Sequence, residues 1–391
     1  MYPHQAERLA SALAAGRLDA LVATSSANIA YITGFGSLVQ TLYPQLEFLA
    51  VSAASGTALV VPTIEAATVV SEAVGADHIQ CHGHFVYAAG EWPDEVSRRI
   101  RALADAATPT AAGALAAVLA ALGLRRGRIG LDEEGLTPPR WRQLAAGLGG
   151  YELVEAGAAL TEARAVKGPW EIECLERALS VAEEALNQVV QTVKPGVTER
   201  EAARLFEEEL ARRGASPYST TILFGERGAF PAAPPSERGL RMGDLVRFDV
   251  GCLLKGYRSD LGRTAVMGEP TTRQERAWNA IAAGLEAAIE QIRPGETGAR
   301  VFQRAIAAVR EAGLPGYDRH HVGHGIGLEA FEPPRLALDS RAVLEAGMVL
   351  RVETPYYEPG WSGLHAKDTV LVTLKGSQIM NRSARGLVVL D

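Results

Sequence analysis

The sequence has few cysteines, no excess of basic residues and no long apolar run. The three cysteines, Cys81, Cys174 and Cys252, are an odd number without paired spacing, so buried reduced thiols are expected and a disulfide framework is not. Lysine and arginine number 39 against 46 aspartates and glutamates, a formal net charge of −7. This balance argues against nucleic acid or an anionic membrane surface as a partner.

Targeting, membrane and dinucleotide signals are also missing. Residues 1–23 have the pattern of an amphipathic helix followed by a strand, without a basic segment leading into an unbroken apolar one, so we expect a cytoplasmic protein. No stretch is long enough to span a bilayer. The segment 33–36 is too short and too early for a dinucleotide-binding loop, because no GxGxxG opens a helix after a strand.

The first part of the chain alternates helical and strand patterns. A helix is predicted near residues 4–15 and strands near 20–23, 48–53, 57–62 and 128–132, which predicts an α/β domain over residues 1–160.

Between these elements the chain carries His78, Cys81, His82 and His84. On a strand, His82 and His84 would share one face, so a small metal site is one interpretation. Hydrogen-bonded or solvated histidines are the commoner alternative.

The second part, residues 161–391, contains an internal duplication. The segment 194–198 (KPGVT) recurs 99 positions later at 293–297 (RPGET), and the hairpin pattern at 243–264 recurs 104 positions later from Gly347. Each half therefore has the pattern helix, Pro-Gly turn, helix and antiparallel hairpin. The predicted fold class is α/β (α+β), with two halves packed by pseudo-twofold symmetry around a central cleft.

Acidic residues lie at matching points of the two hairpins. Asp249 and Glu353 are 104 positions apart, and Asp260 lies on the second strand of the first hairpin, where the second hairpin has Lys367. His324 lies in a glycine-rich segment between them. Each residue alone has an ordinary structural explanation, but together they are the oxygen and imidazole donors expected for a divalent transition metal that activates water.

The sequence resembles the pita-bread enzymes, which include prolidase, aminopeptidase P, methionine aminopeptidase and creatinase. The resemblance covers nearly the whole chain, and residues 28–37 (NIAYITGFGS) look like the creatinase-type amino-terminal domain. The peptidases of this family use Asp, Asp, His, Glu and Glu as metal ligands. The motifs of the first four contain Asp249, Asp260, His324 and Glu353, whereas the fifth motif, G-x-x-x-E-D-T, has Lys367 in place of the last bridging Glu.

Two substrate histidines of the family are also replaced. The family's Pro-His-Gly motif has Ala232 at the histidine position, and its His-Glu-x-Pro motif has Phe331. His320 matches a family histidine that lies near the substrate. The resemblance implies catalytic roles for His320, Lys367 and Glu353. The substrate-binding positions that it implies are Tyr257, Arg258, Phe331 and Ala232.

The lysine changes the charge available for metal. Four carboxylates suit two divalent ions, whereas three carboxylates with a protonated Lys367 carry two net negative charges and suit one ion of Mn, Zn, Co or Fe. In the alternative, no metal binds and Lys367 compensates the buried carboxylates. Creatinase hydrolyses a C–N bond without metal, but its catalytic histidine corresponds to Ala232, so its mechanism does not carry over.

Three functions follow from these alternatives. The first is a diverged hydrolase that acts on a C–N bond of a small amide or dipeptide-like molecule with one metal ion or none. The second is a working Xaa-Pro dipeptidase or aminopeptidase with an altered metal site. The third is a catalytically inactive binding protein that keeps the pita-bread fold. The resemblance also implies a homodimer.

Overall fold

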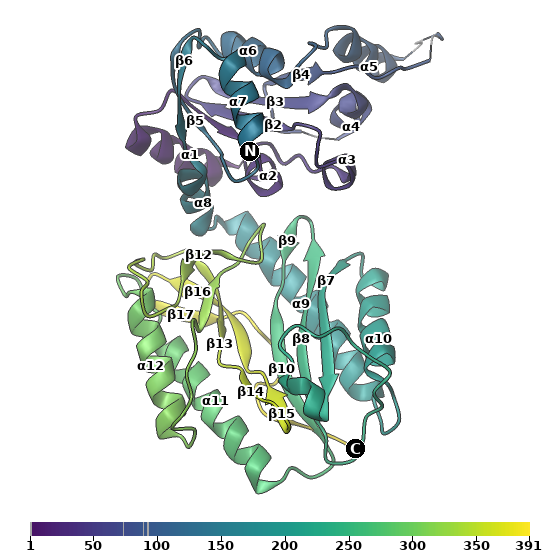
Figure 1. The fold of residues 1–391 in the computed structure, drawn as a ribbon, viewed down its shortest axis with the longest axis vertical. Helices are drawn as coiled ribbons and strands as arrows, with labels where there is room; N and C mark the ends of the chain where they lie inside the picture. Colours follow the sequence, from purple (N-terminus) through teal and green to yellow (C-terminus); the bar gives the residue numbers. More distant parts are fainter. Residues whose placement is uncertain (1, 73, 89, 92–93) are drawn as a thin grey trace. The chain divides into compact units, whose positions relative to one another are not determined.

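The chain forms two units that each have their own core. The computed structural model describes residues 2–72, 74–88, 90–91 and 94–391, and the chain divides into Met1–Arg164 and Ala165–Asp391 (Figure 1). The division falls four residues after the boundary expected from the sequence. Within the described residues, no helix is long and apolar enough to cross a membrane. The three cysteines are buried and unpaired, as predicted.

The amino-terminal unit is a six-stranded mixed sheet with helices on both faces. The strand order is β4-β3-β2-β1-β5-β6, in which β1–β2 and β2–β3 are antiparallel pairs and the other pairs are parallel. The elements, in chain order, are α1 (Pro3–Gly16), β1 (Ala20–Ala23), α2 (Ser26–Thr33), α3 (Leu38–Leu42), β2 (Leu49–Ala53), β3 (Gly56–Pro62), η1 (Thr63–Glu65), α4 (Ala66–Ser71), β4 (His78–His82), α5 (Glu95–Asp105), α6 (Ala111–Ala121), β5 (Gly127–Leu131), α7 (Pro138–Gly147), β6 (Tyr151–Glu155) and α8 (Gly157–Ala165).

Both faces of the central strands β1, β2 and β3 are buried, and these strands are almost continuously apolar, whereas the edge strands β4 and β6 carry polar residues and are only partly buried. Val22 and Val51 pack with Leu115 and Leu119 of α6 on one face. The helices α1 and α2 contact β2 on the other face. The architecture is the α/β domain that the alternating pattern predicts.

A buried carboxylate fixes the first turn of α2. One oxygen of Asp132, which follows β5, accepts hydrogen bonds from the amides of Thr24 and Ser25 at 3.1 and 3.0 Å, from the Ser25 hydroxyl at 2.9 Å and from Asn28 Nδ2 at 2.8 Å. Asp132 is fully buried. It therefore ties the ends of the parallel strands β1 and β5 to the start of α2.

The carboxy-terminal unit is built on one ten-stranded sheet. Its main strand order is β12-β11-β13-β16-β10-β8-β7, with β17, β18 and β9 paired to β16, β10 and β8, and β14 and β15 form a separate pair. The elements are α9 (Pro169–Thr192), α10 (Glu199–Arg212), β7 (Ser216–Phe224), η2 (Gly225–Ala229), β8 (Leu245–Leu254), β9 (Tyr257–Arg258), β10 (Leu261–Met267), α11 (Thr272–Gln291), α12 (Gly298–Glu311), β11 (Gly323–Gly325), β12 (Glu332–Arg335), β13 (Val349–Glu353), β14 (Tyr356–Glu358), β15 (Ser362–Leu364), β16 (Lys367–Thr373), β17 (Gly376–Ile379) and β18 (Val388–Leu390).

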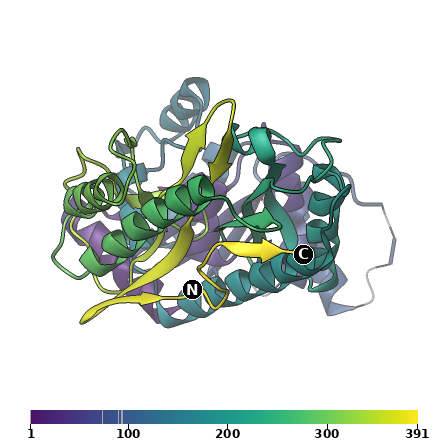
Figure 2. The same cartoon turned by 90° about the horizontal axis from the view of Figure 1, so that it is seen from below.

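The two halves of this unit have separate helical layers. The helices α9 and α10 pack on β7, β8 and β10, and α11 and α12 pack on β13 and β16, so each half has its own apolar cluster. In Figure 1, α11 and α12 lie at the left of this unit and α10 lies at its right. Figure 2 shows the chain end as the yellow strand β18, which pairs in parallel with β10.

The two halves of the duplication contain equivalent backbone hydrogen bonds. The amide of Gly196 donates to the carbonyl of Leu240 at 2.8 Å, and that of Gly295 donates to the carbonyl of Leu344 at 2.9 Å. These partners are offset by the 99 and 104 positions found in the sequence. Both glycines have a positive φ, 93° and 84°, which glycine adopts without the steric penalty of a Cβ. The internal duplication is therefore confirmed.

We expect Asp132→Ala to lower the free energy of unfolding by about 3–5 kcal/mol, because four donors, two of them buried and two partly buried, lose their shared carboxylate acceptor. The exposed Asp105, which pairs with Arg101 on the surface, provides the control. Asp105→Ala is expected to change stability by less than about 0.5 kcal/mol. Urea unfolding of the two variants measures the difference, and similar midpoints would contradict the role given to Asp132.

Candidate active site

Sheet register brings the predicted charged residues into one row. Asp249 on β8 pairs with Gly262 on β10, Gly262 pairs with Lys367 on β16, and Lys367 pairs with Glu353 on β13. Paired residues on neighbouring strands point to the same face, so the three side chains meet across four strands. A Cβ at Gly262 would lie 2.7 Å from the Cβ of Lys367, so this position has to be glycine. Asp260, two residues before Gly262, joins the row from the position directly before β10.

Lys367 lies between the two aspartates. Its Nζ donates to Asp249 Oδ1 at 2.6 Å and to Asp260 Oδ1 at 2.5 Å, and it lies 3.9 Å from Glu353 Oε2. The side chain is 1% exposed. Burial and the nearby Arg351 oppose its protonation, but the three carboxylates outweigh them and raise the pKa of Lys367, which therefore stays charged.

A second buried cation, Arg351, links Asp260 to Glu353. Its Nη1 donates to Asp260 Oδ2 at 2.8 Å, and its Nη2 lies 2.6 Å from Glu353 Oε2. His365 Nε2 donates to the same Glu353 oxygen at 2.9 Å, and burial lowers the pKa of His365. The sequence analysis missed both residues. The signal was present, because Arg351 and His365 each lie two positions before a predicted site residue on an extended segment and so share its face.

The cations hold the carboxylates in their ionised form. Burial would raise the pKa of Asp249, but Lys367, with His365 and Arg351, outweighs burial and holds that pKa well below its usual range. Burial likewise opposes ionisation of Glu353, whereas Arg351 and the hydrogen bond from His365 lower its pKa well below 4.5.

Two neutral histidines lie beside this row and have opposite tautomers. The carbonyl of Gly325 can only accept, so His324 Nδ1 donates to it at 2.8 Å and Nε2 keeps a lone pair, buried and without a hydrogen-bond partner among the described residues. The amide of Gly323 donates to His321 Nδ1 at 3.2 Å, so the proton of neutral His321 is on Nε2. Burial lowers the pKa of His324 to about 2 and that of His321 to about 4.

Further cationic groups lie at the edge of the row. Arg247 Nη1 lies 3.8 Å from Asp249 Oδ2, and Arg319 Nη2 lies 3.7 Å from Glu353 Oε1. Both guanidinium groups lie over the ring of Tyr357, at 5.2 and 5.6 Å from its centroid. The Nε atoms of both arginines are buried without a hydrogen-bond partner in the described part of the chain.

Phe331 and His321 both lie next to the row. The sequence analysis selected Phe331 but not His321. The ring of Phe331 stacks on His324 with centroids 3.4 Å apart, and the guanidinium of Arg351 lies 5.5 Å from its centre. His320 is exposed and packs edge-on against His321. His321, rather than His320, faces the row, with Nδ1 3.8 Å from Glu353 Oε1.

The other three positions predicted to bind substrate have contacts or exposure unlike those of Phe331. Tyr257 is buried, donates to Glu171 Oε1 at 3.0 Å and packs edge-on against Trp170. Arg258 lies over the ring of Tyr218 at 5.1 Å. Ala232 is exposed.

The arrangement does not fit a divalent ion. Both oxygens of Asp260 accept from protein cations, Asp249 accepts from Lys367, and Glu353 Oε2 accepts from Arg351 and His365. Three carboxylates against two cations leave one net negative charge. Among the described residues, no group of three or more His, Cys, Asp or Glu side chains is arranged to hold a metal ion. His324 keeps the tautomer of a metal ligand, but the carboxylates that would complete the shell are engaged.

The histidines of the amino-terminal unit are not arranged to bind a metal ion either. The strand β4 ends at His82, so His84 does not share its face. His82 Nε2 makes a hydrogen bond with the carbonyl of Glu47 at 2.7 Å, and burial raises the pKa of Cys81 to about 11. His82 is therefore a hydrogen-bonded histidine, and the described residues of this segment do not form a metal site.

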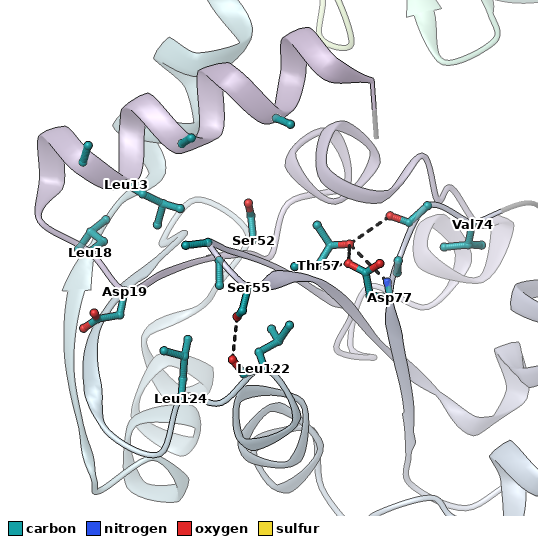
Figure 3. A pocket seen from close by; sticks show the side chains of 18 residues that line it. Leu13, Leu18, Asp19, Ser52, Ser55, Thr57, Val74, Asp77, Leu122 and Leu124 are labelled. Atoms are coloured by element: carbon teal, nitrogen blue, oxygen red, sulfur yellow. Dashed lines mark hydrogen bonds between the residues drawn. The ribbon is translucent and has the colours of Figure 1, made fainter.

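The amino-terminal unit also contains a pocket of about 1010 Å³ between α1 and the β2–β3 turn (Figure 3). Several of its polar groups are already paired. The Ser55 hydroxyl donates to the carbonyl of Leu122 at 2.7 Å, and Asp77 Oδ2 accepts from the amide and the hydroxyl of Thr57 at 2.8 and 3.0 Å. The described residues that line the pocket include no histidine or cysteine, so we do not assign it to catalysis.

Both units of the chain match known protein families. Residues 173–374 match the family model of metallopeptidase family M24, and residues 5–166 match that of the creatinase/prolidase N-terminal domain. The Xaa-Pro dipeptidase of Pyrococcus furiosus is 33% identical over 231 residues, which are 59% of this chain and 66% of that protein.

Solved structures are similar over almost the whole chain. A structure of Xaa-Pro dipeptidase from Bacillus anthracis superposes with a TM-score of 0.81 and 25% identity and covers 99% of both chains. The dipeptidase PepE from Mycobacterium ulcerans superposes with a TM-score of 0.79 and 26% identity, covering 99% of this chain and 97% of that one.

We expect Lys367→Met to lower the free energy of unfolding by about 3–5 kcal/mol, because Asp249 and Asp260 lose the cation that compensates them. Lys375, exposed in the turn between β16 and β17, provides the matched control. Lys375→Met is expected to stay within about 0.5 kcal/mol of the native chain. Equal stabilities in urea unfolding would show that the two aspartates do not depend on Lys367.

Proposed function

We infer that this chain, which belongs to metallopeptidase family M24 and carries a creatinase/prolidase amino-terminal domain, is a hydrolase of a C–N bond in a small amide or dipeptide-like molecule. The relatives named Xaa-Pro dipeptidase support the bond type. The observation that carries the proposal is the pair of neutral histidines with opposite tautomers, His321 and His324, whose ring centroids are 5.7 Å apart.

The tautomers of these histidines match the two proton transfers of amide hydrolysis. His324 Nε2 has a free lone pair and can accept a proton from the attacking water. His321 Nε2 carries a proton and can give it to the leaving nitrogen. The carboxylates are poor candidates for either step, because ion pairs with Lys367 and Arg351 hold them ionised and engaged.

The edge of the site supports a substrate with a free carboxylate. Arg319 and Arg247 lie over Tyr357, and each has a buried Nε without a partner among the described residues. A guanidinium group binds a carboxylate well because its donors match the two oxygens. Phe331, exposed and stacked on His324, provides an apolar wall for the side chain of such a substrate.

A second candidate function is ligand binding without turnover. With a pKa of about 2, His324 is a weak base, because a general base works best when its pKa is near the working pH. An ordinary metal-dependent Xaa-Pro dipeptidase has less support, since protein cations engage the carboxylates. A cytoplasmic homodimer remains part of the proposal, and light scattering of the purified protein tests its size.

The test is hydrolysis of a panel of Xaa-Pro dipeptides and N-acyl amino acids in the presence of a chelator. We expect turnover that the chelator does not reduce. We also expect His321→Ala to lower kcat/KM by about 100-fold or more, through loss of the proton donor.

His320→Ala decides between the two neighbouring histidines. Because His320 is exposed, we expect its loss to change kcat/KM by less than about 3-fold, well below the effect of an acid–base residue. A larger loss for His320→Ala than for His321→Ala would reverse the assignment. Ligands that raise the melting temperature without any turnover would favour the binding protein.

A further inference from the structure

The charged residues of the carboxy-terminal sheet alternate in sign along one chain of contacts. Lys367 Nζ joins Asp249 to Asp260, and Arg351 joins Asp260 to Glu353. Asp260 is shared, with Oδ1 facing the ammonium and Oδ2 facing the guanidinium. Each cation therefore bridges two carboxylates, and one carboxylate is bridged by both.

We propose that Lys367 and Arg351 together replace two divalent ions, with one protein cation at each ion position, and that the chain is consequently a metal-independent member of its family. The proposal concerns the cations of the site, so it does not depend on whether the chain hydrolyses an amide. It adds Arg351 to the single lysine substitution visible in the motif comparison.

Burial makes this replacement stable. Lys367 is 1% exposed and the side chain of Arg351 is 10% exposed, so their ion pairs with Asp260 and Glu353 are little screened by solvent, whereas the side chain of Asp249 is 22% exposed. A divalent ion bound to the same oxygens would lie within a few ångströms of a buried ammonium or guanidinium group and be strongly repelled. A cation attached to the backbone also cannot be removed by a chelator.

Although the two cations share Asp260, each of them excludes a metal ion from a different position. If Lys367 is replaced by glutamate, Arg351 still engages Asp260 Oδ2 and Glu353 Oε2, so only the position between Asp249 and Asp260 becomes free. Removal of Arg351 in addition frees the second position. Four carboxylates would then carry the four negative charges that suit two divalent ions.

The test is the metal content of folded protein after incubation with Mn²⁺ and removal of the free ion, measured by inductively coupled plasma mass spectrometry. The native chain is expected to hold no ion, Lys367→Glu one ion per chain, and Lys367→Glu with Arg351→Ser two ions. Any other series of counts in folded protein overturns the assignment of one cation to each ion position.

Two surface variants control for the change of charge. Lys375→Glu and Arg335→Ser alter an exposed lysine and an exposed arginine that pairs with Asp339, and both are expected to hold no ion. Uptake by either control would mean that added Mn²⁺ binds elsewhere and would overturn the interpretation of the counts.

If a variant fails to fold even in Mn²⁺, measurements on the native chain alone test metal independence. Its melting temperature is expected to be the same with a chelator, with Mn²⁺ and with neither, and its bound manganese is expected to be absent. A melting temperature that falls on chelation, or one bound ion per native chain, would overturn metal independence. Neither measurement requires a substrate, so failure here is distinguishable from failure of the proposed hydrolysis.

Discussion

The compensation of buried carboxylates is the constraint on which the carboxy-terminal unit depends. Asp249, Asp260 and Glu353 lie in the middle of a ten-stranded sheet, where an ionised carboxylate without a partner is strongly unfavourable. Positive charge must be present, either as bound ions or as protein side chains. This chain uses Lys367 and Arg351, whose hydrogen bonds saturate most of the facing oxygens.

The internal duplication creates this requirement. Each half of the unit has its own helical layer and its own apolar cluster, and each contributes strands to one sheet. The halves join where β10 pairs with β16, so carboxylates from the first half face Glu353 and Lys367 from the second. The charged row lies at the seam, because that is where equivalent positions of the two halves become neighbours. A substitution on one side of the seam therefore changes the electrostatics of both halves.

The replacement of ions by side chains has consequences for chemistry. A bound ion can lower the pKa of water and polarise a carbonyl group, whereas a buried ammonium or guanidinium group supplies charge without an open coordination position. Proton transfer then depends on groups outside the ion pairs. His321 and His324 remain neutral beside the row, and Arg319 and Arg247 bring positive charge to its edge. The site is thus better arranged for a small anion than for a cation.

The sequence predicted the fold well, because the fold depends on patterns that repeat along the chain. The offsets of 99 and 104 positions reappear in the hydrogen bonds of Gly196 and Gly295, and they predicted two equivalent halves before any contact was known. The same offset linked Asp249 to Glu353. The replacement of the family's last bridging Glu by Lys367 was also visible in the sequence, because the residues of that motif have a fixed spacing.

Only the tertiary structure decided which other side chains complete the site. The two-residue period places Arg351 and His365 on the same face as Glu353 and Lys367, but their contacts with Asp260 and Glu353 depend on the register between strands far apart in the chain, which a single sequence does not contain. His321 faces the row while His320 faces solvent, and they are adjacent in an irregular segment where no period assigns a side chain to a face. Local order along the chain determined the fold and the acidic residues, whereas the partners of those residues depend on long-range packing.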